Sequence, residues 1–159
     1  IHAEALKFLA EHRERPFFLY YPTTIPHLAL QVPEEPLAEY VGQFPETPYL
    51  GGQGYVPHIT PRAAYAAMVT HLDRQIGELL DAVNAYGLDE ETIVVLTSDN
   101  GPAPQGIGGT DSAFFESALG SRGLKGSNYE GGIRVPGLVR WTGHLAAGQV
   151  IDRVTGFED

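Results

Sequence analysis

Residues 92–102 read Thr-Ile-Val-Val-Leu-Thr-Ser-Asp-Asn-Gly-Pro, and this stretch decides the fold class. Its first five residues are mostly β-branched and apolar, as in a buried strand, and Gly101-Pro102 stops that strand at once. Asp99 and Asn100 therefore follow the carboxyl end of a strand predicted over 92–98, which is where ligands bind in open α/β sheets. Carboxylate and amide oxygens suit a hard divalent cation, Ca²⁺ or Mg²⁺, although the same residue types also favour a plain turn.

Two segments have the periodicity of amphipathic helices. Residues 3–13 place Leu and Ala on one face and predict a short helix. A longer helix is predicted over 61–86, where apolar residues recur at alternating spacings of four and three (Tyr65, Val69, Leu72, Ile76, Leu79, Val83). Thr60 is its expected cap, Pro61 suits the first helical position, and Gly87 is expected to end it in a left-handed conformation.

The remaining segments predict strands and long loops. Residues 16–21 read as a buried strand, and 133–141 as another that Pro136 places at an edge or a bulge. A proline-rich excursion over 23–60 and a glycine-rich segment over 101–132 connect these elements. The order predicts an α/β fold with a mainly parallel sheet and long loops at one rim.

The composition excludes several classes of function. The 159 residues are 43% hydrophobic, enough for one domain with a real core. Twenty acidic residues against ten basic ones give a net charge of −10, which argues against a nucleic-acid partner. No apolar run is long enough for a membrane span. The absence of cysteine excludes disulfides, thiolate metal sites and a Cys nucleophile within this chain.

Two further side chains are candidates for a site at the rim of the sheet. His27 follows the strand predicted over 16–21, so it is expected at the same rim as Asp99, where it could protonate or hold a leaving group. Lys125 lies among glycines that let backbone approach a ligand closely, and its ammonium could clamp an oxyanion. Residues of these two types are more often plain surface groups, and no Gly-Lys-Ser/Thr phosphate loop is present. The apolar side chains Phe114, Phe115 and Leu119 are expected to pack their loop down or to wall a substrate pocket.

Four stretches taken together, in this order along the chain, resemble the sulfatase family of the alkaline-phosphatase-like superfamily: 26–33 (PHLALQVP), 65–73 (YAAMVTHLD), 97–101 (TSDNG) and 124–136 (LKGSNYEGGIRVP). The resemblance implies an α/β/α sandwich with a mainly parallel sheet, present here incompletely. It also implies that residues 1–159 form a single partial domain, the central and C-terminal part of a sulfatase catalytic domain.

The resemblance further implies roles for individual residues. Asp99 and Asn100 match the second pair of calcium ligands, with Ca²⁺ expected rather than Mg²⁺. Lys125 matches the lysine that grips the sulfate, and His27 the histidine that contacts the ester and assists its leaving oxygen. The reaction of the family is hydrolysis of a sulfate ester by a formylglycine residue.

Other parts of the family pattern are missing from this chain. The formylglycine motif, a paired Asp-Asp and a Lys-x-His segment belong upstream of Ile1 in the family. We therefore expect the parent protein to be a calcium-dependent sulfatase, acting on a small-molecule or carbohydrate sulfate ester, and the isolated chain to be inactive. A phosphonate or phosphate ester hydrolase of the same superfamily, or a non-catalytic module that keeps the fold, are the alternatives. The resemblance favours a periplasmic or extracellular location, and leaves the particular ester and the oligomeric state open.

Overall fold

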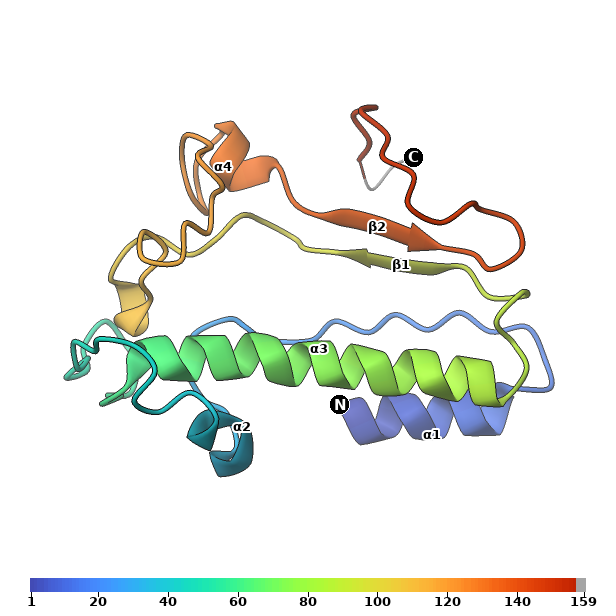
Figure 1. Cartoon of the computed structure of the whole chain (residues 1–159), viewed down its shortest axis with the longest axis horizontal. Helices are drawn as coiled ribbons and strands as arrows, with labels where there is room; N and C mark the ends of the chain where they lie inside the picture. The colour runs from blue at the N-terminus through green and yellow to red at the C-terminus, as the bar shows by residue number, and fades with distance from the viewer. Residues whose placement is uncertain (157–159) are drawn as a thin grey trace.

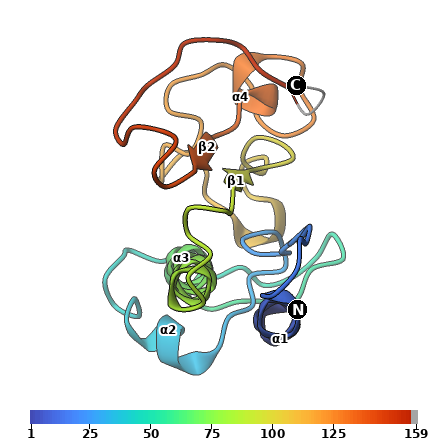
Figure 2. The same cartoon turned by 90° about the vertical axis from the view of Figure 1, so that its right-hand side faces the viewer.

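The longest helix of the described residues is α3 (Pro61–Ala85), and two shorter helices pack against it. The computed structural model describes residues 1–156. Helix α1 (His2–His12) runs beside the C-terminal half of α3, and the short α2 (Glu34–Ala38) packs near its N-terminal half (Figure 1). The end-on view shows these three helices in one layer, below a two-stranded ribbon (Figure 2). The helices predicted over 3–13 and 61–86 are thus confirmed.

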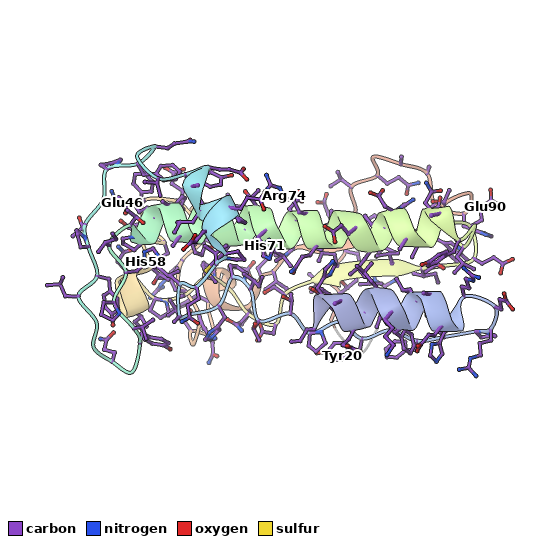
Figure 3. The ribbon with its side chains drawn as sticks, turned by 90° about the horizontal axis from the view of Figure 1, so that it is seen from below. Tyr20, Glu46, His58, His71, Arg74 and Glu90 are labelled. Atoms are coloured by element: carbon purple, nitrogen blue, oxygen red, sulfur yellow. The ribbon has the colours of Figure 1, made fainter. Side chains whose placement is uncertain are left out.

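The two ends of α3 are set by different chemistry. Pro61 occupies the first turn as predicted, and Gly87 follows the last turn with φ +70°. Thr60 occupies the N-cap position as predicted, but its side chain makes no capping hydrogen bond. The carboxylate of Glu46 instead accepts hydrogen bonds from the backbone amides of Arg62 and Ala63, at 3.0 and 2.8 Å (Figure 3). An acid 15 residues or more away in sequence therefore satisfies the free amides of this helix.

The buried face of α3 is built mainly from small residues. Ala63, Ala64 and Ala67 are fully buried, and Met68 is 3% exposed. The periodicity predicted a stripe through Val69, but Val69 is 43% exposed. The reason is that the segment 25–32 packs on the alanine face of the helix, where a Cβ alone allows close approach.

The ribbon consists of β1 (Val94–Thr97) and β2 (Gly137–Arg140), which pair antiparallel with Val94 opposite Arg140. The expectation of a mainly parallel sheet is not met by this pair. Residues 98–136 stay at the carboxyl end of β1, so β2 starts where β1 stops and has to run back along it. A parallel neighbour would need a crossover that returns the chain to the start of β1.

The predicted strand over 16–21 is an extended segment without ladder partners among residues 1–156. Its side chains Phe18 and Tyr20 are 87% and 76% exposed. β1 and β2 likewise expose apolar side chains, including Val95 and Leu138. Such exposure is unusual for strand residues of this composition, and exposed apolar patches of this kind commonly mark surfaces that contact other protein.

Helix α4 (Glu130–Ile133) lies in the upper layer with part of the long loop after β1, whereas the short 3₁₀-helix η1 (Ile107–Gly109) lies beside the N-terminal end of α3 (Figure 1). The strand predicted over 133–141 is shorter in the structure, because Ile133 ends α4 and β2 begins only at Gly137. Among the described residues no helix is both long and apolar enough to cross a membrane.

Candidate active site

Backbone hydrogen bonds join the loop after β1 to the segment that carries Lys125. The Gly101 amide donates to the Gly132 carbonyl at 2.9 Å. The Lys125 amide donates to the Pro102 carbonyl at 2.8 Å. Lys125 is thereby fixed beside the residues that directly follow Asp99-Asn100, although 25 positions separate Asn100 from Lys125.

Close packing of glycines makes this arrangement possible. A Cβ added to Gly101 would lie 2.0 Å from the carbonyl oxygen of Gly131, and one added to Gly131 would lie 2.0 Å from that of Gly123. Side chains larger than hydrogen cannot fit between these backbones. At Gly101 the requirement is for space alone, since its φ lies outside the left-handed region.

His27 is held over α3 by its apolar neighbours. Leu30 is 2% exposed and forms a core cluster with Ala64 and Met68, against which Leu28 also packs. These contacts anchor the segment and leave the imidazole of His27 exposed.

The side chains of His27 and Lys125 meet across 98 positions of sequence. Lys125 Nζ lies 3.0 Å from His27 Nε2, and His27 Nδ1 lies 2.7 Å from the Leu28 carbonyl oxygen. A carbonyl oxygen only accepts, so Nδ1 carries the proton, and an ammonium only donates, so Nε2 is the acceptor. This pair of contacts corresponds to the tautomer of His27 with a proton on Nδ1, whose Nε2 lone pair is directed at Lys125.

Lys125 differs from most cations of the chain in its partners. Within residues 1–156, no carboxylate lies within 4.0 Å of its ammonium group, whereas Lys7, Arg62 and Arg74 all pair with acids. The half-buried ammonium is thus free to bind an anion in a chain whose net charge is −10.

Asp99 and Asn100 carry side-chain oxygens that could bind a metal ion. Asp99 is exposed and Asn100 half-buried, and neither side chain has a hydrogen bond or ion pair within the described part of the chain. Ser98 Oγ donates to the Asn100 carbonyl and holds the turn. This donor set fits a hard cation such as Ca²⁺, which takes six to eight oxygens. It is only part of such a set, because residues 1–156 contain no group of three His, Cys, Asp or Glu side chains that could hold a metal.

A second network holds the neighbouring loops. Arg62 donates to Asp111 Oδ2 through Nε at 2.9 Å and Nη2 at 2.6 Å, and both side chains are 19% exposed. Hydrogen bonds from Gln105, Arg62 and the Phe114 amide hold the pKa of Asp111 below its ordinary value. Phe114 packs against the Arg62 guanidinium, 4.1 Å from its ring centre.

This network was not recognised from the sequence, because 49 positions separate Arg62 from Asp111 and no motif links them. The expectation that Phe114 and Phe115 pack their loop down is supported by their ring contacts with Phe44. Leu119 in the same loop is 91% exposed and packs nothing.

Comparisons with known proteins identify the family of this chain. The sulfatase family model matches residues 1–159. Human arylsulfatase A is 33% identical over 143 residues, which are 87% of this chain and 22% of that protein. Steryl-sulfatase of Mus musculus is 32% identical over 98% of this chain and 22% of that protein. The crystal structure of Ps i-CgsB in complex with k-i-k-neocarrahexaose superposes with a TM-score of 0.70 at 30% identity, over 92% of this chain and 28% of that one.

The chain belongs to the sulfatase family, whose fold is the alkaline-phosphatase-like α/β fold. It spans less than a third of the length of these relatives. The activity of a complete protein and the identity of its substrate are therefore matters for proposal.

Proposed function

We propose that the protein carrying this chain hydrolyses sulfate esters and that this chain supplies one half of its active site. The observation that supports the proposal is the contact between Lys125 and His27, at 3.0 Å, with no carboxylate beside the ammonium. A cation left without an acid partner, with a hydrogen-bonding imidazole on it, is a ready site for a tetrahedral oxyanion.

In this proposal Lys125 binds the sulfate and opposes the charge that develops on it during hydrolysis. His27 Nε2, which accepts from Lys125 in the free state, moves to the ester oxygen when the substrate enters. Nε2 takes up a proton from water, and the resulting imidazolium transfers this proton to the leaving oxygen as the S–O bond breaks, while Nδ1–H keeps its bond to Leu28. The Leu28 carbonyl thus fixes which ring nitrogen is available for catalysis.

Asp99 and Asn100 would hold a calcium ion together with donors from outside this chain. Bound Ca²⁺ would polarise the sulfate oxygens, and a formylglycine outside the chain would supply the nucleophile. The free oxygens of Asp99 and Asn100, at the carboxyl end of β1, support this assignment.

The test is hydrolysis of an aryl sulfate by the full-length protein and by two lysine variants. The chain contains two lysines, so Lys7→Met is a matched control for Lys125→Met. Lys7 is exposed on α1, where it pairs with Glu11 at 4.0 Å. We expect Lys125→Met to lower kcat about 100- to 1,000-fold, the usual effect of losing one oxyanion donor, and Lys7→Met to leave it unchanged.

Further measurements distinguish a sulfatase from a phosphate or phosphonate ester hydrolase and from a non-catalytic module. Asp99→Ala is expected to remove most of the activity and its response to added Ca²⁺, and the isolated chain is expected to show no turnover. A phosphate monoester hydrolysed faster than the aryl sulfate would favour the phosphate or phosphonate hydrolase reading. Absence of turnover with either ester would favour a non-catalytic module.

A further inference from the structure

A cavity of about 160 Å³ opens beside His27. Thr24, His27 and Gln31 supply its polar lining, and Met68 and Leu28 are among its apolar residues. Met68 is 3% exposed and belongs to the core cluster on α3, so this end of the cavity is closed by the helix. His27 and Thr24 are exposed and lie toward solvent.

Two of the polar side chains in this cavity, Thr24 and Gln31, are uncharged and free. Within residues 1–156, neither the Gln31 amide nor the Thr24 hydroxyl has a hydrogen-bond partner. No carboxylate lies among the described residues that line the space, and its one ring is the imidazole of His27. An amide and a hydroxyl can both donate and accept hydrogen bonds, so they suit the hydroxyl groups of a neutral ligand better than a charged group.

We propose that this cavity binds the alcohol part of the ester, and that this part is a single hydroxylated ring such as a sugar residue. The inference rests on the proposed function, because the alcohol part reaches this cavity only if the ester oxygen binds at His27. The sulfate lies on Lys125, the bridging oxygen at His27, and the ring extends toward Gln31. Gln31 and Thr24 are then residues that determine specificity.

The size of the cavity supports one ring over a larger group. At about 30 Å³ for each water in the liquid, it has the volume of roughly five waters. Whole ligand pockets are typically about 300–1,000 Å³, so this is the space of one ring of a ligand. The four fused rings of a steroid exceed this volume, so most of a sterol would lie outside the cavity.

Kinetics on the full-length protein test the proposal with three substrates: a monosaccharide sulfate, an aryl sulfate and a sterol sulfate. We expect Gln31→Leu to raise KM for the sugar sulfate about 3- to 10-fold, as for the loss of one hydrogen bond, and Thr24→Val to act in the same direction. Hydrolysis of the aryl sulfate should change less than about 2-fold. Gln149→Leu, in the exposed segment after β2, is the matched control. Unfolding temperatures verify that the variants fold, which is expected because Gln31 is exposed.

The outcomes separate this inference from the proposed function. If the aryl sulfate is hydrolysed but Gln31→Leu leaves KM for the sugar sulfate unchanged, the cavity assignment is wrong and the sulfatase assignment survives. Preference for the sterol sulfate over the sugar sulfate would also overturn the cavity assignment. If no sulfate ester is hydrolysed, the proposed function itself fails.

A binding measurement provides a readout that needs no turnover. Met68 is the only methionine of the chain, so [¹³C-methyl]methionine labelling places one signal of the chain at the closed end of the cavity. Addition of an unsulfated methyl hexoside to the full-length protein should shift the Met68 signal, which a Met68→Leu variant identifies, and Gln31→Leu should weaken the shift, while Gln149→Leu should not. A signal that stays unmoved at saturating hexoside, or moves equally in Gln31→Leu, contradicts the proposal.

Discussion

Gly101→Ala is the sharpest test of how the site is held together. The new Cβ would lie 2.0 Å from the Gly131 carbonyl oxygen and 3.1 Å from Gly132 Cα. Since both neighbours are backbone, one segment has to move by about 1 Å to reach even a tight contact. That shift would weaken the Gly101–Gly132 and Lys125–Pro102 hydrogen bonds, each worth about 1 kcal/mol. With about 1–3 kcal/mol for overpacking, we expect a loss of about 3–5 kcal/mol in the free energy of unfolding.

The assay is urea and thermal unfolding followed by circular dichroism. For a chain of this length the expected loss corresponds to a fall in Tm of roughly 10 °C. Gly137→Ala is the matched control, because nothing lies within 4 Å of its Cβ position and its φ is not left-handed. A loss below about 1 kcal/mol for Gly101→Ala, or an equal loss in Gly137→Ala, would refute the account of the site as a close approach of backbones.

Three further results are expected. A double-mutant cycle of Arg62→Met and Asp111→Asn should give a coupling free energy of about 1 kcal/mol at neutral pH. Because the pKa of Asp111 is lowered in the folded state, this coupling should be full above the ordinary aspartate pKa and should vanish as the pH falls through the lowered pKa. A coupling that grows toward acid pH would contradict the ion pair. Gly77→Ala, in the interior of α3 with open space around its Cβ, should stabilise the chain by about 0.5–1 kcal/mol in the same unfolding assay, and a destabilisation would count against the helix packing. Nitrogen-15 NMR of the free chain should find His27 protonated at Nδ1 and bare at Nε2, and the opposite tautomer would remove its contact with Lys125.

Local pattern was a good guide to elements whose causes lie within a few residues. The long helix was predicted to within one residue, because its apolar spacing, Pro61 and Gly87 all act locally. β1 was found for the same reason. The cap at Glu46 was missed, since a carboxylate that reaches a helix from a preceding loop leaves no local signature. The isolated strand over 16–21 shows the same limit, because a ladder depends on what lies alongside.

The candidate site divides in the same way. Residue chemistry singled out His27, Lys125, Asp99 and Asn100, since an imidazole, an ammonium, a carboxylate and an amide each limit what they can bind. The structure supplies the contact between His27 and Lys125. The placement of Asp99-Asn100 against a metal stays a prediction.

The amino-acid sequence by itself determined the long helix, the β-branched strand with its acid–amide end, and the kinship with sulfatases, because these depend on local spacing and on residue type. Only the tertiary structure decided that β2 runs back along β1, that Lys125 meets His27, and that a cavity opens toward Gln31. Each of these depends on groups far apart along the chain, whose approach is set by packing on α3 and by glycines that leave room for backbone to touch backbone.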